Sequence, residues 1–326
     1  MSYPPSPPWA DTDPDQPLLL VPPRRRPRWS FVLAALTLLT TCAAGGYEFT
    51  PTGRAAGDLL FSGGVSGFFA ALLLVLVSGL PYGLAVMAFF VVHELGHYVA
   101  CRIYRVDSTP PIFLPVPPWP FLFGTLGAVI RIRTPIPTRR ALFDIGIAGP
   151  LAGFVVATAL IVAGTLGATA VSPHPLGYGE TVFGDCLMTK LVVLLFRPEW
   201  KDMELRVGPV YMAGWLGMLA TTMNLIPAGQ LDGGHIVYAL APRWHQPIAL
   251  SSGAFLLGLV TLRGLYYGEL STWMLWAAVV FIFGRRHPPL PEYEPSLGRG
   301  RQLLALAAAL VLLLTFMPVP IAVGLH

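Results

Sequence analysis

Two histidines and a glutamate stand together near the end of a long apolar run, in the segment His93-Glu94-Leu95-Gly96-His97. On a helix with 3.6 residues per turn, positions four apart lie on one face, so His93 and His97 can offer two imidazoles to one metal ion. Glu94 lies about 100° further round the helix, where it can hold an attacking water without serving as a ligand. Zinc hydrolases use this H-E-x-x-H spacing, but two histidines do not complete a catalytic zinc site. A third ligand must therefore come from elsewhere in the chain.

Asp232 is the predicted third ligand. It follows an apolar run at about 207–225 and lies within the segment Gly229-Gln230-Leu231-Asp232-Gly233-Gly234-His235. A carboxylate completes a two-histidine zinc site and leaves a fourth position for water. An ionised group at membrane depth is also costly unless it is paired or coordinated. We expect Gly233 and Gly234 to let the backbone approach the metal-binding helix closely. His235, three residues further on, remains an alternative ligand.

The composition indicates what surrounds this site. Of the 326 residues, 54% are hydrophobic and only 12% are charged, whereas a soluble domain carries about a quarter charged residues. So little polar surface cannot cover a globule, and the lipid bilayer must be the solvent for much of the chain. The arginine cluster Arg24-Arg25-Arg26 directly precedes the first apolar run. The positive-inside rule accounts for this position, so we expect no nucleic-acid partner.

The chain divides into a tail and a membrane domain. Residues 1–28 are polar and rich in proline and arginine, which predicts a disordered cytoplasmic tail. Residues 29–326 are predicted to form one membrane-embedded domain with a catalytic core at about 67–240. We expect an all-α polytopic protein with about six to seven transmembrane helices. The expected spans are about 30–47, 82–104, 141–167, 207–225, 247–264, 270–284 and 302–323.

The sequence also predicts the structure of the segments between the spans. Pro81 breaks the apolar run, so 67–79 is predicted to be a short or re-entrant helix. Residues 50–64 are expected to form an external loop, and 168–206 a loop with a short apolar piece. Residues 111–133 combine prolines with β-branched residues in partial alternation, which predicts a small membrane-associated β-hairpin or sheet.

Several polar residues are predicted to have structural roles. Asp144 is expected to pair with Arg139 or Arg140. Gly149 and Gly153 are expected to allow close helix packing. The remaining histidines are expected to be solvated in loops or at the terminus: His174, His245, His287 and His326. Arginine counting places the N-terminus and the active-site end on the cytoplasmic side of the cell membrane.

These motifs together resemble the site-2 protease family of intramembrane metalloproteases. The resemblance rests on His93-Glu94-x-x-His97, on Asn224-x-x-Pro227 followed by Asp232-Gly233, and on Gly149-Pro150. It covers most of residues 80–240 and implies one Zn²⁺ ion held by His93, His97 and Asp232. It further implies that Glu94 is the general base and that Asn224 stabilises the reacting amide or its oxyanion. An alternative role for Asn224, as a buried amide that pins two helices together, remains open.

The resemblance also implies a bundle of about six helices and a reaction. The expected substrate is a membrane-anchored protein whose transmembrane helix must unwind before a peptide bond is cut. Gly124 and Thr125 lie in the extended segment 111–133, which we expect to bind the unwound peptide by β-addition. Residues 168–206 are too short for a PDZ domain, and no CBS pair is recognisable after residue 240. The short type of the family is therefore expected, and the sequence leaves the oligomeric state open.

A transporter and a non-catalytic scaffold are the two alternatives to a protease. A transporter would also have several spans and a broken helix, but it predicts internal symmetry between two halves, which the sequence does not show. A non-catalytic scaffold is expected to lack the glutamate or a ligand. His93, Glu94, His97 and Asp232 are all present, so the sequence favours an enzyme.

Overall fold

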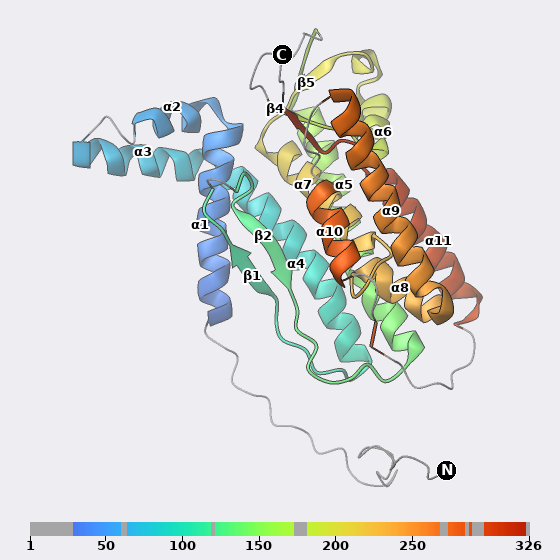
Figure 1. Ribbon diagram of the computed structural model, residues 1–326. Coiled ribbons are helices and arrows are strands. Elements are labelled where there is room, and N and C mark those ends of the chain that lie inside the picture. Colours follow the sequence, from blue (N-terminus) through green and yellow to red (C-terminus); the bar gives the residue numbers. More distant parts are fainter. Residues whose placement is uncertain are drawn as a thin grey trace, which may run out of the picture.

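The computed structural model describes residues 29–59, 64–118, 121–172, 181–267, 273–283, 287–288 and 297–323. The predicted tail at 1–28 lies outside these residues. The described chain is mostly helical (Figure 1). Its α-helices are α1 (Trp29–Phe49), α2 (Pro51–Leu59), α3 (Gly64–Ser78), α4 (Leu80–Ile103), α5 (Arg139–Leu166), α6 (Leu187–Phe196), α7 (Pro209–Leu225), α8 (Asp232–Leu240), α9 (Pro242–Tyr267), α10 (Trp273–Phe283) and α11 (Gly298–Thr315).

The helices confirm a mostly α-helical membrane protein. Among the described residues, five helices are long and apolar enough to cross a membrane, namely α1, α4, α5, α9 and α11. Shorter apolar helices, α3, α6 and α10, accompany them. The 17-residue helix α7 runs through the middle of the bundle, packed against α4 and α5. It is apolar on nearly every side and buried from Tyr211 to Leu219, as expected for a helix enclosed by others.

Three short antiparallel strand pairs accompany the helices. β1 (Ile112–Pro115) and β2 (Thr125–Val129) form the hairpin predicted within 111–133, with Ile112 opposite Val129. β3 (Thr169–Val171) pairs with β5 (Glu204–Arg206), and β4 (Thr181–Phe183) pairs with β6 (Ile321–Val323). These last two pairs were not predicted, because strands of three residues are too short to show an alternating pattern.

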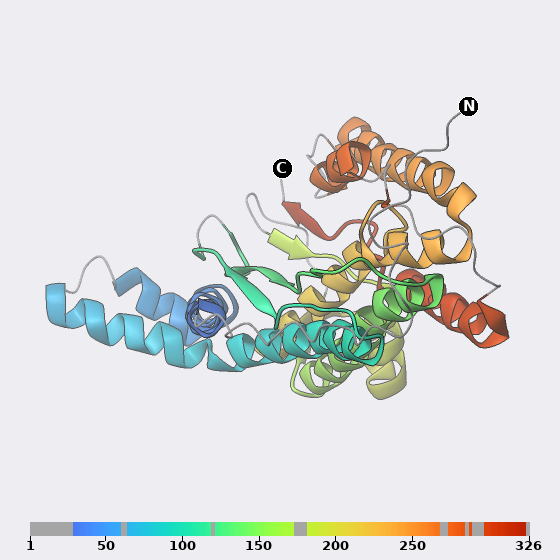
Figure 2. The same ribbon diagram turned by 90° about the horizontal axis from the view of Figure 1, so that it is seen from below.

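The chain bends between α3 and α4, where Gly79 alone separates the two helices (Figures 1 and 2). Pro81 lies in the first turn of α4, where its missing N–H costs no hydrogen bond. A Cβ atom on Gly79 would lie 1.8 Å from the carbonyl oxygen of Cys42, so glycine is needed where this turn meets α1. The predicted loop at 50–64 was wrong, since residues Pro51–Leu59 form α2. The helices α2 and α3 project sideways from one end of α1, away from the bundle (Figures 1 and 2).

Two further predictions are corrected by tertiary contacts. The last span was expected at 302–323, but α11 ends at Thr315 and the chain then forms β6. Asp144 pairs with Arg301, not with Arg139 or Arg140; the Arg301 Nε and Nη2 atoms lie 2.9 and 2.6 Å from its two carboxylate oxygens. The Tyr104 hydroxyl donates to the same carboxylate. This cluster joins the end of α4 to α5 and α11, a pairing that no local sequence pattern could indicate.

Candidate metal centre

Helix α4 carries three buried ionisable side chains within five residues. His93, Glu94 and His97 are 2%, 5% and 6% exposed. The two imidazoles face each other, with their Nε2 atoms 3.2 Å apart. Burial of such groups in an apolar helix is costly unless they pair or bind a metal.

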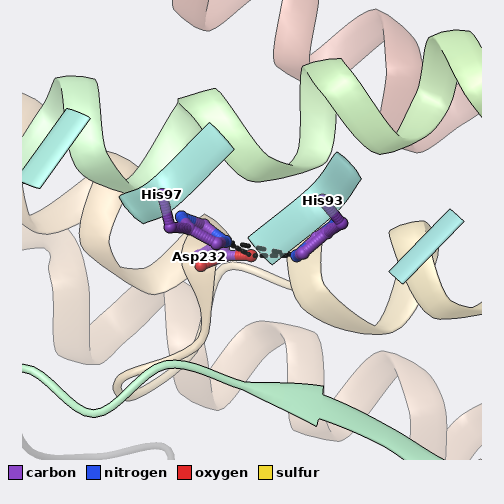
Figure 3. Close-up of side chains that lie close together, drawn as sticks. All are labelled: His93, His97 and Asp232. Atoms are coloured by element: carbon purple, nitrogen blue, oxygen red, sulfur yellow. Dashed lines mark hydrogen bonds and ion pairs between the residues drawn. The ribbon is translucent and has the colours of Figure 1, made fainter. Parts of the chain in front are cut away.

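Asp232 completes the group from another part of the chain. It is the first residue of α8, so its carboxylate lies at the positive end of the helix dipole. One of its oxygens, Oδ2, lies 3.5 Å from His93 Nε2 and 3.3 Å from His97 Nε2 (Figure 3). The structure therefore brings the three predicted ligands together from α4 and α8, and it gathers no other such group of His, Cys, Asp or Glu in the described residues.

The spacing of the three ligand atoms fits a zinc ion. A tetrahedral zinc with bonds of about 2.0–2.1 Å places neighbouring ligand atoms roughly 3.3 Å apart. The three separations observed here are 3.2, 3.3 and 3.5 Å. Two imidazoles and one carboxylate are also the ligand set of catalytic zinc sites that keep one position open. The cluster thus has both the chemistry and the dimensions of a zinc site.

A backbone hydrogen bond fixes the ring of His97. Its Nδ1 atom lies 2.7 Å from the carbonyl oxygen of Ile145 in α5. A carbonyl only accepts, so Nδ1 carries the proton and Nε2 keeps the lone pair that a metal requires. Sequence reasoning did not identify Ile145, because a backbone carbonyl leaves no trace in residue type.

A row of glycines on α5 makes room for the ligands. A Cβ atom on Gly149 would lie 2.1 Å from His97 Nε2, and one on Gly153 would lie 2.9 Å from His93 Nδ1. A Cβ atom on Gly146 would lie 2.9 Å from the Cβ of His235 in α8. Gly149 and Gly153 lie three and seven positions after Gly146, so all three glycines share one helix face. This face of α5 contacts both helices that carry ligands. The predicted packing role of Gly149 and Gly153 is confirmed, and their spacing from Gly146 was a signal that sequence reasoning missed.

The glycines after Asp232 have a different role from the one predicted. A Cβ atom on Gly233 would lie 2.1 Å from the carbonyl oxygen of Leu225, and one on Gly234 would lie 2.4 Å from that of Gly229. The close approach is therefore to the end of α7 and the turn after it, and not to the metal-binding helix. Gly229 itself has φ +56°, a conformation that favours glycine. The tight turn folds α8 back so that Asp232 reaches the histidines.

Glu94 and Asn224 lie beside the cluster without belonging to it. The backbone of Ile130, directly after β2, lies close enough to the Glu94 carboxylate to stabilise its charge. The Asn224 side-chain nitrogen lies 3.3 Å from His93 Nε2. This contact joins α7 to α4, so it is compatible both with helix pinning and with a role at the reacting centre.

Gly124 and Thr125 lie at the turn of the hairpin, with their polar groups already engaged. The Thr125 hydroxyl donates to Leu114 O at 3.0 Å, and the Thr40 hydroxyl of α1 donates to Gly124 O at 2.7 Å. Gly124 has φ +71°. Both residues therefore shape the hairpin, and their predicted contact with substrate stays a prediction.

The prediction of solvated histidines was wrong for His245, and His287 is partly buried. His245 is 2% exposed, with Nε2 3.1 Å from Gly229 O. His287 stacks on Tyr238, and its Nε2 lies 2.8 Å from Nδ1 of His235. Burial lowers the pKa of His287, which keeps the ring neutral and able to accept this hydrogen bond. His235, the alternative metal ligand, uses its Nδ1 atom in this hydrogen bond. His174 and His326 lie outside the described residues.

The sequence of this chain matches a known protein family. Residues 81–262, more than half of the chain, match peptidase family M50. The chain belongs to peptidase family M50. This match confirms the resemblance that the motifs indicated, and it favours a hydrolase over a transporter. No solved structure matches the chain.

The relatives of this M50 chain include plant proteins described as probable chloroplastic zinc metalloproteases. Zinc metalloprotease EGY1 of Oryza sativa subsp. japonica is 29% identical over 250 residues, covering 74% of this chain and 41% of the relative. EGY2 of Oryza sativa subsp. indica is 30% identical over 248 residues, covering 73% and 43%. EGY2 of Arabidopsis thaliana is 30% identical over 225 residues, covering 67% and 38%. The chain spans about two fifths of the length of these curated relatives.

The close contact between Gly149 and His97 can be tested by adding a methyl group at Gly149. In Gly149→Ala the added methyl group would displace His97, so we expect zinc affinity to fall roughly 10- to 100-fold, as when a group that orients a metal ligand is lost. Gly258→Ala in α9 is the matched control, because no atom lies within 4 Å of its added Cβ. Zinc content after dialysis against graded chelator would be measured together with the melting temperature. A folded Gly149→Ala protein with unchanged zinc affinity would contradict this account.

Proposed function

We propose that this protein is an intramembrane zinc metalloprotease that hydrolyses peptide bonds within or near the transmembrane helices of membrane-anchored proteins. The observation that carries the proposal is the meeting of His93, His97 and Asp232 at zinc-ligand spacing, with Glu94 buried beside them. His93, Glu94 and His97 lie on α4, which is long and apolar enough to cross a membrane. Membership of peptidase family M50 supports the same reaction class.

The residues divide the chemistry among them. Zinc, when bound, supplies Lewis-acid polarisation and lowers the pKa of water at its open position towards about 7. Glu94 is proposed as the general base, which accepts the proton of the attacking water and passes it to the leaving amine. The Ile130 backbone contact would hold its carboxylate in place. When His93 Nε2 binds a metal its lone pair is used, so the Asn224 N–H becomes available to the developing oxyanion.

The substrate is proposed to bind as an extended strand along the open edge of β2. The N–H of Arg133 donates to Asp107 O, and the carbonyl of Arg131 accepts from the N–H of Thr109, so both residues face the β1 side. Alternation then turns Ile130 and Ala128 towards the open edge. The contact of Ile130 with Glu94 agrees with this direction. A peptide added to this edge would pass next to the proposed base.

We also propose that the protein lies in the cell membrane with its N-terminus and the metal centre towards the cytoplasm. Arg102 and Arg105 stand at the end of α4 that carries the histidines. The start of α1, which follows the N-terminal arginines, lies at the same end of the molecule (Figure 1). Arginine concentrated at one end is the signature of a cytoplasmic side.

Removing the proposed base separates metal binding from catalysis. In Glu94→Gln we expect retained zinc, because the residue is not a ligand, and cleavage of a helical membrane substrate slowed by roughly 10²- to 10⁴-fold. Asp232→Ala is the comparison, with loss of both zinc and cleavage. Metal analysis and single-turnover cleavage would be run on the same preparations. Undiminished cleavage by Glu94→Gln would rule out this mechanism.

The strand edge is tested by removing one N–H group. Ala128→Pro deletes an edge donor in a place where proline is tolerated, and we expect kcat/KM for a membrane substrate to fall up to roughly tenfold, the effect of one hydrogen bond. Ala128→Val retains the donor and serves as control. If both variants cleave equally well, substrate does not bind along this edge.

Orientation is tested by cysteine labelling. The native Cys42, Cys101 and Cys186 are all buried, so the background is expected to be low. Cysteine introduced at Asp202, which is 85% exposed, should react with a membrane-impermeant maleimide in intact cells. Cysteine at Arg105 should react only after lysis. The reverse pattern would invert the proposed topology.

A further inference from the structure

A cavity of about 930 Å³ lies between β4, β5, α6 and the start of α7. It is far from the metal centre along α7. Tyr211 lines the cavity, whereas Asn224, thirteen positions later, lies at the metal cluster. At 1.5 Å per residue this separation is about 20 Å. Figure 1 shows β4 and β5 at the end of the molecule away from α8.

Two short strands, β4 and β5, border this cavity. All three residues of β4 and all three of β5 line it. Successive side chains of a strand point to opposite faces, so a cavity over one face would contact alternate residues. Because consecutive residues of both strands line the cavity, we infer that it borders their backbones as well as their side chains. Within the described part of the chain, β4 pairs only with β6 and β5 only with β3. Among the described residues, the edge of β4 that borders the cavity therefore carries N–H and C=O groups that no other strand pairs with.

The register identifies which groups of β4 face outward. The N–H of Gly184 donates to Pro320 O at 2.8 Å, so Gly184 faces the β6 side. Alternation turns the backbone groups of Phe183 and Thr181 to the open edge. These are the groups that an added strand would contact.

The side chains around the cavity suit a peptide better than a lipid headgroup. Apolar residues such as Trp215 and Leu205 are interspersed with charges of both signs, including Asp185, Lys190 and Arg206. A carboxylate beside the cations opposes binding of a phosphate group. A peptide strand presents a neutral main chain and side chains of mixed polarity, so it matches this lining.

We propose that this cavity binds, by β-addition, an extended segment of the substrate protein that flanks its transmembrane helix at the end away from the metal. The proposal rests on the proposed function and adds a second contact to it. A distance of about 20 Å corresponds to roughly six extended or thirteen helical residues. The bound segment would thus begin about that many residues from the cut bond.

The test measures binding, with cleavage disabled by Glu94→Gln in the full chain embedded in nanodiscs. The probe is a synthetic single-span Leu/Ala helix with a fluorescent label and a flank of alternating Thr and Val. Comparison probes have no flank, or a flank with proline at alternate positions, which cannot pair as a strand. Val193→Trp fills the cavity from α6. Leu195→Trp on the same helix, 67% exposed and not a lining residue, is the matched control.

We expect Val193→Trp to raise the dissociation constant of the Thr/Val probe roughly tenfold. Leu195→Trp should bind this probe as the parent protein does. Neither substitution should change binding of the probe without a flank. The proposal would be overturned if Val193→Trp bound the Thr/Val probe as tightly as the parent protein does. It would also be overturned if the probe with the proline flank bound as tightly as the Thr/Val probe. A third contrary outcome is a Val193→Trp protein that binds the peptide probe normally but retains less anionic phospholipid. The cavity would then be a lipid site. Failure of the wild-type chain to cleave any probe would refute the protease function and leave the binding result intact.

Discussion

The close approach of α5 to its neighbours is the constraint on which the metal centre depends. Three ligand atoms must come within about 3.3 Å of one another, although they belong to two helices separated by more than a hundred residues. Packed helix axes usually lie 8–10 Å apart, a spacing set by the side chains between them. Gly149 and Gly153 remove those side chains where the imidazoles lie, and Gly146 does so where α8 packs. One face of α5 thereby supports both halves of the site.

A second constraint is the cost of polar groups in an apolar bundle. Asp232 lies between two imidazoles at the start of a helix, and Asp144 is paired with Arg301. Arg139 donates to the carbonyl oxygens of Ala239 and Leu240 at the end of α8. Asp232, Asp144 and Arg139 thus each have partners, and each of these contacts also fixes a helix end. The same contacts that offset desolvation hold α5, α8 and α11 in register around the metal centre.

The architecture separates two tasks along α7. One end of this buried helix presents Asn224 to the metal cluster, and the other forms a wall of the cavity beside β4 and β5. Because α7 is enclosed by its neighbours along most of its length, it connects the two regions through the interior of the bundle. The hairpin β1–β2 stands between α1 and α4 beside the metal centre (Figure 1). Open strand edges therefore occur both near the chemistry and about 20 Å from it.

The sequence by itself determined the parts of this protein that depend on local periodicity and residue type. Helical spacing predicted His93 and His97 on one face, apolar runs located most of the helices, and prolines with β-branched residues indicated the hairpin. Asp232 could be paired with the histidines because an isolated carboxylate in an apolar segment requires a partner. Tertiary structure alone decided the contacts between distant segments: the Ile145 carbonyl on His97, Arg301 on Asp144, buried His245, and the β4–β6 pair. Such contacts depend on where whole helices pack, and backbone groups or three-residue strands leave no periodic signal from which that packing can be inferred.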